Sequence, residues 1–198
     1  MNHIDKTIEA IFVSKVRIKA LKYFLYNPKK SIHLREAVRE FEEEITSVRR
    51  ELSRLEEAKL LLSQVKENKK YYRLNMEHEF IDELIGIVHK SYGLGYAVIS
   101  QSRKLGNIEF ALLTSAFTKG QFFGPQVIDL LVVGDIDLDL LSEIVKEEEY
   151  KINREIHYMV MKSSEFVMRK RRRDQNLLDI IFQDLVLLIG KKADLIKL

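Results

Sequence analysis

Apolar residues recur at helical spacing between residues 44 and 57, which predicts a helix with one buried face. The buried stripe consists of Ile45, Val48, Leu52 and Leu55. The remaining faces of this helix carry hydroxyl and guanidinium groups rather than apolar side chains. The polar positions that point outward are Thr46, Ser47, Arg49, Arg50, Ser53 and Arg54.

A two-stranded hairpin is predicted directly after this helix. Residues 60–65 are apolar and strand-like, residues 66–70 form a charged tip, and residues 71–74 return as a second strand rich in aromatic β-formers. Before the helix, a short strand begins near Ser31, and the apolar spacing of residues 34–41 predicts a shorter helix.

Two further helical patterns flank this region. Residues 8–25 form a helical pattern that stops at Asn27, because Pro28 disfavours helix in the residue before it, and Ser14 is suited to cap the later part. Residues 79–91 carry apolar side chains over too wide an arc for a helix with one wet face. This second helix is therefore expected to be buried on two sides, either against a second subunit or between two domains of the same chain.

The second half of the chain alternates strand and helix patterns, as α/β domains do. The fold class predicted for the whole chain is mixed α+β. The expected domains are residues 1–76, a linker helix at 77–93, and an α/β domain at 94–198. The expected strands are residues 108–113, 128–133 and 156–161, the expected helices are 138–145 and 177–182, and an apolar run at 185–189 follows.

Composition adds limits on class and location. The 198 residues are 46% hydrophobic and include no cysteine, so disulfides and thiolate metal sites are excluded. No sustained apolar run is long enough to span a bilayer, and the first residues lack the pattern of a secretory signal, so a cytoplasmic protein without a membrane partner is expected. Residues 1–75 carry 17 basic against 11 acidic side chains, whereas residues 76–198 carry 16 against 19. The excess of positive charge therefore lies in the first part of the chain.

Two helices followed by a basic hairpin is the element order of a winged helix-turn-helix. A helix fits the major groove of B-DNA, where arginine side chains can reach base edges while a flanking basic loop meets phosphate. The predicted partner is double-stranded DNA, bound by a homodimer that acts as a transcriptional regulator. Glutamates at residues 42–44 oppose this interpretation, because they would repel a nearby phosphate. The candidates for base-edge or phosphate contact are Arg49, Arg50 and Arg54, and the candidates for phosphate contact alone are Lys66, Lys69 and Lys70. The hydroxyl side chains of the same helix, Thr46, Ser47 and Ser53, complete the predicted DNA-binding set.

Segments 115–120 (Ser-Ala-Phe-Thr-Lys-Gly) and 127–134 (Val-Ile-Asp-Leu-Leu-Val-Val-Gly) resemble the minimal nucleotidyltransferase domain of the polymerase-beta superfamily. Members of that family show Gly-Ser-Phe-Ala-Arg-Gly, a loop, and then Ser-Asp-Ile-Asp-Leu on a strand. Segments 12–17 and 48–52 look like prokaryotic regulators in which a winged helix is fused to such a domain. The resemblance extends over nearly the whole chain.

The resemblance implies a degenerate transferase site. Active members need two carboxylates at alternate strand positions to hold the divalent metals, and here only Asp129 is present, with Val127 at the partner position. Ser115 and Ala116 stand where the family has glycine and serine. No catalytic residue, metal ligand or cofactor is therefore assigned, and Mg²⁺ and a nucleotide are expected only if the site is functional. The predicted remnant nucleotide site consists of Ser115, Ala116, Lys119, Gly120 and Asp129.

Two alternatives to an inactive sensing or assembly domain stay open. The first is an active nucleotidyltransferase that modifies a protein, tRNA or small molecule through Asp129 and an unorthodox metal partner. The second is an interaction protein, such as one half of a toxin–antitoxin pair, in which the remnant domain binds another chain. A nucleotide or a partner protein is the possible partner of the C-terminal domain. The basic run at residues 169–173 is either a solvated helix end, a second phosphate contact or an anion site.

Overall fold

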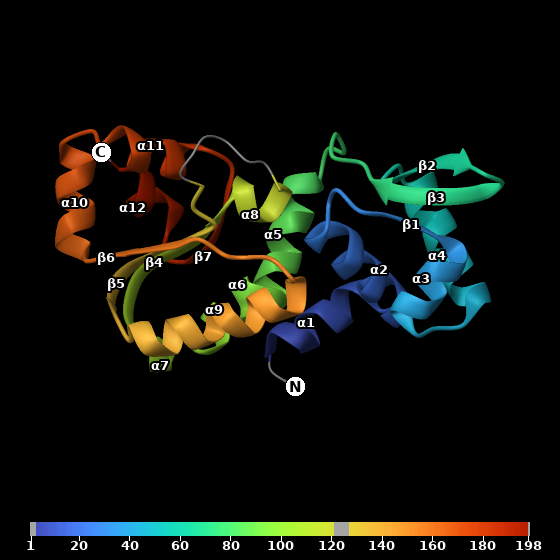
Figure 1. Ribbon diagram of the computed structural model, residues 1–198, viewed down its shortest axis with the longest axis horizontal. Coiled ribbons are helices and arrows are strands. Elements are labelled where there is room, and N and C mark those ends of the chain that lie inside the picture. The colour runs from blue at the N-terminus through green and yellow to red at the C-terminus, as the bar shows by residue number, and fades with distance from the viewer. Residues whose placement is uncertain (1–2, 121–126, 198) are drawn as a thin grey trace. The chain divides into compact units, whose positions relative to one another are not determined.

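The computed structural model describes residues 3–120 and 127–197, and it has a mixed α/β architecture with two β-sheets (Figure 1). The chain divides into two compact units, Met1–Ser91 and Tyr92–Leu198. The division falls within the predicted linker at residues 77–93. Each sheet lies within one unit, so each unit has its own core.

The N-terminal unit combines five helices with a three-stranded sheet among its described residues. Ser14 accepts a hydrogen bond from the Arg17 backbone N–H (3.3 Å) and starts a new helix after Val13, whose φ of 53° breaks the preceding one. The single helical pattern of residues 8–25 is therefore two helices. The elements are α1 (His3–Phe12), α2 (Lys15–Tyr26), β1 (Ser31–His33), α3 (Leu34–Phe41), α4 (Ile45–Glu57), β2 (Leu61–Lys66), β3 (Lys69–Leu74) and α5 (Ile81–Ser91).

The sheet of this unit has the order β1-β3-β2, with both pairings antiparallel. The turn between β2 and β3 consists of Glu67 and Asn68, both with positive φ (48° and 60°). Two consecutive left-handed residues are typical of the tight hairpin turn whose twist matches that of the strands. The hairpin predicted from residues 60–74 is thus confirmed, with its tip at Glu67 and Asn68.

The C-terminal unit is built around a four-stranded sheet of order β6-β5-β4-β7. β5 pairs with β6 in parallel, and the other pairings are antiparallel. Among the described residues its elements are α6 (Gly93–Ser100), α7 (Ser102–Leu105), β4 (Gly106–Thr114), α8 (Ser115–Lys119), β5 (Leu130–Ile136), α9 (Leu138–Ile152), β6 (Tyr158–Met161), α10 (Ser163–Arg171), α11 (Gln175–Phe182), β7 (Leu185–Ile189) and α12 (Lys192–Ile196).

Alternating side chains of the central strands β4 and β5 face opposite layers. Figure 1 shows α9 and α6 on one side of the sheet and α10, α11 and α12 on the other. The second side holds a buried cluster in which Phe110 and Phe166 pack with ring centroids 5.4 Å apart. The cluster comprises Phe110, Leu112, Leu131, Val133, Met161, Phe166, Leu177, Ile181 and Leu195.

Several elements differ from the predictions. The strand expected at residues 128–133 begins only at Leu130, so Val127 and Asp129 precede it. The apolar run at residues 185–189 is a strand, which periodicity alone could not decide, and α6 and α7 had no predicted counterpart. Ile45 was assigned to the buried stripe but is 40% exposed; it is the first residue of α4, and the buried face of the helix starts at Val48.

Candidate nucleic-acid interface

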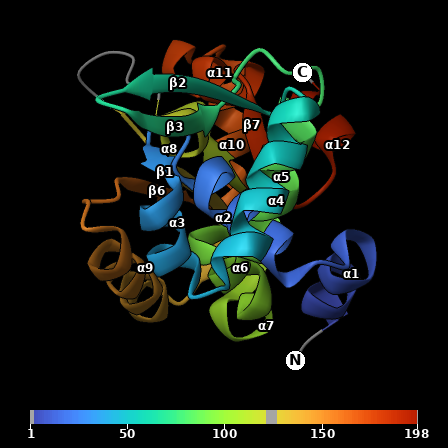
Figure 2. The same ribbon diagram turned by 90° about the vertical axis from the view of Figure 1, so that its right-hand side faces the viewer.

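α4 presents a polar face of the predicted composition. Val48, Leu52 and Leu55 are buried against the rest of the unit and fix which side faces outward. Figure 2 shows α4 and the β2–β3 hairpin together on the side of this unit that faces the viewer. Of the predicted DNA-contacting side chains on α4, Thr46, Arg49, Arg50 and Arg54 are exposed, and Ser47 and Ser53 are half-buried.

A buried carboxylate lies beneath this face. Glu51 is 2% exposed and occupies the apolar side of α4, next to Leu52. Its Oε2 accepts from the Arg17 Nε at 3.0 Å, and its Oε1 accepts from the Arg54 Nη1 at 2.9 Å. Arg54, predicted to contact DNA, is therefore already committed to a partner inside the unit, although its side chain is 54% exposed.

Arg49 and Arg50 differ from Arg54 in this respect. Both are exposed, and neither forms an ion pair with a residue in the described part of the chain. Their guanidinium groups remain directed at solvent, where each offers five N–H donors in a planar fork. They are the two arginines of α4 that can meet an external anion without giving up an internal one.

The three lysines of the hairpin also differ in whether they are paired within the unit. Lys66 and Lys69 are exposed, whereas the Lys70 Nζ lies 2.6 Å from the Glu56 Oε2 near the end of α4. Glu56 also accepts from the Ser63 hydroxyl at 2.5 Å. These hydrogen bonds, that from Lys70 first, lower the pKa of Glu56, and the same pair raises the pKa of Lys70. The pair links α4 to the hairpin, so a phosphate at Lys70 would share the ammonium with Glu56 or compete with it.

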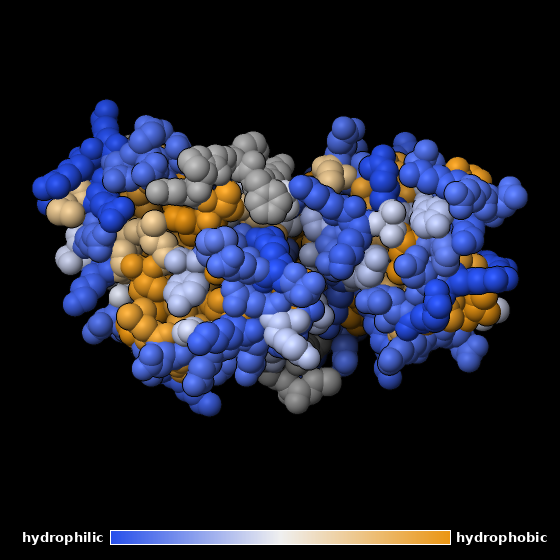
Figure 3. Space-filling model, viewed as in Figure 1, coloured by the Kyte–Doolittle hydropathy of each residue, from blue (hydrophilic) through white to orange (hydrophobic). Residues whose placement is uncertain are grey.

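The acidic turn before α4 is partly neutralised. Glu42, at a φ of 51°, ends α3, and Glu44 stands at the N-cap of α4 without a side-chain cap. Glu43 pairs with the Lys19 Nζ at 2.8 Å, and the same ammonium donates to the Phe41 carbonyl at 2.6 Å. One of the three predicted opposing charges is therefore turned toward α2. The visible face of the N-terminal unit is mostly hydrophilic (Figure 3).

The predicted remnant nucleotide site in the C-terminal unit lies in and next to the short helix α8. Ser115 and Ala116 are buried in the short helix α8, and Gly120 ends that helix with a φ of 62°. The Lys119 Nζ lies 2.9 Å from the Asp184 Oδ2. The structure thus places Ser115, Ala116, Lys119 and Gly120 in one segment, and it pairs the lysine with Asp184, an exposed carboxylate of the same unit.

The side chain of Asp129 is held by two residues that come shortly before β6 in the sequence. Its side chain is 1% exposed, forms an ion pair with Arg154, and accepts from the His157 backbone N–H at 3.0 Å. The Arg154 guanidinium also lies 5.3 Å from the centre of the Phe117 ring. An arginine therefore supplies the positive charge beside this carboxylate. Arg154 and Glu51 are among the residues that sequence reasoning did not assign to these clusters, although a carboxylate on an apolar stripe was a usable signal for Glu51.

The basic run at residues 169–173 is divided among several roles. Arg169 pairs with Glu165 at 2.7 Å. The Lys170 Nζ donates to the Leu195 carbonyl at 2.8 Å, and burial lowers the pKa of this lysine. The rest of the run, from Arg171 to Arg173, is exposed at the end of α10.

Within residues 3–120 and 127–197, no three His, Asp or Glu side chains are grouped closely enough to hold a metal ion. Over the same residues, no helix combines the length and apolarity needed to cross a membrane. Comparisons of the chain with protein-family models, with curated proteins and with solved structures gave no match.

Proposed function

We propose that the N-terminal unit is a winged helix-turn-helix that binds double-stranded DNA, and that the protein is a homodimeric transcriptional regulator. The observation that carries this proposal is the outward face of α4, where Arg49 and Arg50 are exposed and not engaged by an internal carboxylate. In the proposed complex, α4 enters the major groove and the hairpin lysines Lys66 and Lys69 meet phosphate.

Element order and pairing give further support. β1, α3, α4, β2 and β3 follow one another as in that motif, and the hairpin turn leaves Lys66 and Lys69 opposite each other in the register of the two strands. The Lys70–Glu56 pair joins the hairpin to α4, so the two proposed contact elements touch each other.

For the C-terminal unit we propose a nucleotidyltransferase-like fold that serves as a sensing or assembly module. The ion pair of Asp129 with Arg154 and the pairing of Lys119 with Asp184 support this role over transferase chemistry, because both groups are committed internally. Magnesium-dependent incorporation from labelled nucleoside triphosphates tests it. Incorporation that Asp129→Asn abolishes would establish the enzyme instead.

The test of DNA binding is a fluorescence-anisotropy titration of the 198-residue chain against duplex fragments from upstream of its own gene, at two salt concentrations. Arg50→Ala is expected to weaken binding to the preferred fragment by about 1–3 kcal/mol if the side chain reads a base. Arg103→Ala, at an exposed arginine of α7 in the other unit, is the matched control and is expected to leave the affinity unchanged.

Lys66→Ala and Lys69→Ala separate phosphate contact from base contact. Each is expected to weaken binding equally on every fragment and to reduce the slope of log K against log salt by about 1. Absence of salt-dependent binding to any duplex would refute the proposed function. An equal loss on every fragment for Arg50→Ala would reassign that residue to phosphate.

A further inference from the structure

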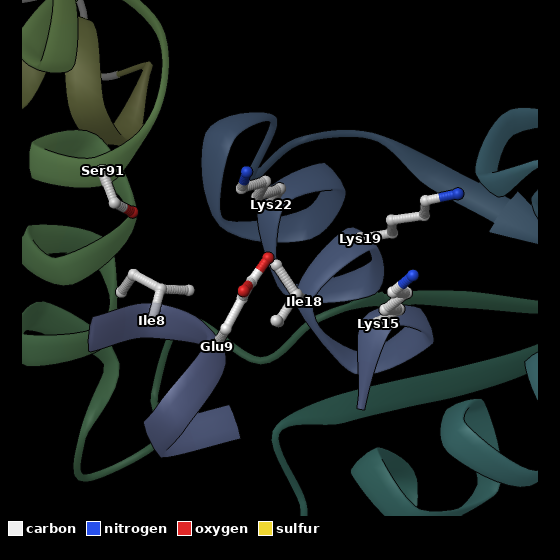
Figure 4. Close-up of a pocket in the computed structure, with 7 residues that line it drawn as sticks. All are labelled: Ile8, Glu9, Lys15, Ile18, Lys19, Lys22 and Ser91. Carbon is white, nitrogen blue, oxygen red and sulfur yellow. The ribbon is translucent and has the colours of Figure 1, made fainter. Parts of the chain in front are cut away.

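A pocket of about 250 Å³ lies between α1 and α2 of the N-terminal unit (Figure 4). The Glu9 carboxylate lies between the apolar side chains of Ile8 and Ile18. The ammonium groups of Lys15 and Lys19 point away from that gap. The lining therefore does not select one class of ligand, whereas the sheet of the C-terminal unit presents an edge with a defined set of outward backbone groups.

The strand at this edge is β6, which has no second neighbour in the described part of the sheet. The His157 carbonyl accepts from the Leu130 N–H of β5 at 3.2 Å, so His157 directs its backbone groups toward β5. Consecutive residues of a strand direct these groups to opposite sides. Tyr158 and Val160 therefore direct their N–H and C=O groups to the outer side of β6, where an added strand can pair with them.

The groups at both ends of this edge are already used. The Ile156 N–H, two positions before Tyr158, donates to the Glu149 Oε1 at 2.7 Å. The Lys162 carbonyl, two positions after Val160, accepts from a backbone N–H of α10 at 3.0 Å. An added strand that leaves both of these bonds intact therefore pairs with Tyr158 and Val160.

β6 also lacks side chains that discourage pairing. Its four residues, Tyr-Met-Val-Met, include no charge and no proline, and Tyr158 is 40% exposed. Figure 3 shows apolar side chains over this strand, between α9 and α10, on the visible face of the unit. The opposite edge, β7, has a register shift against Ala111 and Leu112 of β4, an irregularity of the kind that blunts an edge. β6 is therefore the edge of this sheet that is suited to pairing.

We propose that two copies of this chain pair through β6 in antiparallel orientation, so that their four-stranded sheets become one continuous sheet. The inference rests on the homodimer of the proposed function and names its interface. Tyr158 of each copy pairs with Val160 of the other, and each of these pairs exchanges both backbone hydrogen bonds. Met159 then lies opposite Met159 of the second copy, on the two-fold axis.

The charges beside β6 favour a second copy in this orientation. Glu155 precedes the strand and Lys162 follows it, and both are exposed. In the antiparallel pair, Glu155 of each copy comes to the end of the strand where the other copy has Lys162 and the N-terminus of α10. A parallel pair in register would instead bring like charges together.

The register is tested by a disulfide. The 198-residue chain contains no cysteine, so Met159→Cys provides a single thiol in each copy. In the proposed register the two Cα atoms of residue 159 lie about 4.5 Å apart, which a disulfide can span. We expect oxidation with diamide to cross-link most of this variant into dimers. Val65→Cys, at an exposed position of the β2–β3 hairpin, is the matched control and is expected to stay mostly uncross-linked.

The strength of the dimer is measured by analytical ultracentrifugation, and we expect a Kd on the order of 10 µM for so short an edge. Val160→Pro removes an outward N–H that β5 does not use, and it is expected to weaken dimerisation at least about tenfold. Val160→Ala keeps this N–H and is expected to weaken dimerisation less than about threefold. Circular dichroism checks that each variant is folded.

A charge exchange tests the orientation without relying on the proline variant. Glu155→Lys and Lys162→Glu are each expected to weaken dimerisation about fivefold, because each brings like charges together across the two copies. The double variant exchanges the two charges and is expected to restore the original Kd to within about twofold.

The outcomes separate the interface from the rest of the proposed function. A mass that stays at 23.3 kDa up to about 200 µM would overturn the interface and the homodimer together. A dimer that Met159→Cys does not cross-link, and that the charge reversals leave unchanged, would overturn the interface alone. If the dimer forms through β6 while no duplex binds, the proposed DNA binding fails and the interface stands.

Discussion

The clearest prediction concerns the ion pair between Asp129 and Arg154. Arg154→Met keeps most of the length of the side chain but removes the guanidinium, which leaves the Asp129 carboxylate, 1% exposed, with the His157 N–H as its partner. Breaking a buried ion pair by removing one partner costs about 3–5 kcal/mol. Arg154 is itself 31% exposed, so water can enter and the lower end of that range applies.

A second contribution comes from the aromatic contact. The guanidinium lies over the Phe117 ring, and a partly exposed cation–π contact contributes about 0.5–1 kcal/mol. The expected loss in the free energy of unfolding is therefore about 3.5–4 kcal/mol at neutral pH. Combining the change with Asp129→Asn removes the unpaired charge and is expected to restore about 2 kcal/mol.

The assay is urea unfolding followed by far-UV circular dichroism, since the chain contains no tryptophan. Amide hydrogen exchange on β5 and β6 should place the loss within the C-terminal unit. A loss below about 1 kcal/mol for Arg154→Met, or no recovery in the double variant, would show that Asp129 does not depend on Arg154 as its counter-ion.

Two further predictions concern the backbone and pH. Gly134→Ala is expected to lower the free energy of unfolding by about 2–5 kcal/mol, because φ is 152° and a Cβ would lie 2.2 Å from the Asn107 carbonyl oxygen. Gly86→Ala, with open space around it, should instead raise the free energy of unfolding by about 0.5–1 kcal/mol. Urea unfolding measures both changes. Glu56 has a lowered pKa in the folded state, so its contribution is present above the unfolded pKa, about 4.3, and is lost as pH falls through the lower folded value. Lys70→Gln should therefore reduce stability slightly at pH 7, by less than about 1 kcal/mol for so exposed a pair, and have no effect near pH 2; a loss equal at both pH values would contradict this.

The sequence was sufficient where a feature depends on local pattern. α4 begins and ends within one residue of the predicted helix, and Ser14 caps α2 as its hydroxyl and position indicated. The strands β4 and β6 and the hairpin followed from apolar runs and their turn residues. These elements depend on neighbours within a few positions, which a sequence displays directly.

The missed features depend on contacts between distant positions. Arg154 meets Asp129 across 25 positions, and this requires the parallel pairing of β5 with β6 that brings the starts of both strands together. Arg17 meets Glu51 across 34 positions, through the packing of α2 on α4. The pattern of α4 indicated that Arg54 faces outward, but it could not indicate that Arg54 also bonds to Glu51, three positions earlier on the same helix.

Glu51 has a consequence for the angular setting of α4. A helix held by an apolar stripe alone can roll about its axis, since contacts between apolar side chains have no preferred direction. Here one oxygen of Glu51 is bound to α2 through Arg17 and the other to the next turn of α4 through Arg54. Rolling α4 would break the directional hydrogen bond between Glu51 and Arg17 of α2, so this carboxylate fixes the rotation of α4 about its own axis. Substitution of Arg17 can therefore change which side chains of α4 face outward without altering any residue of that helix.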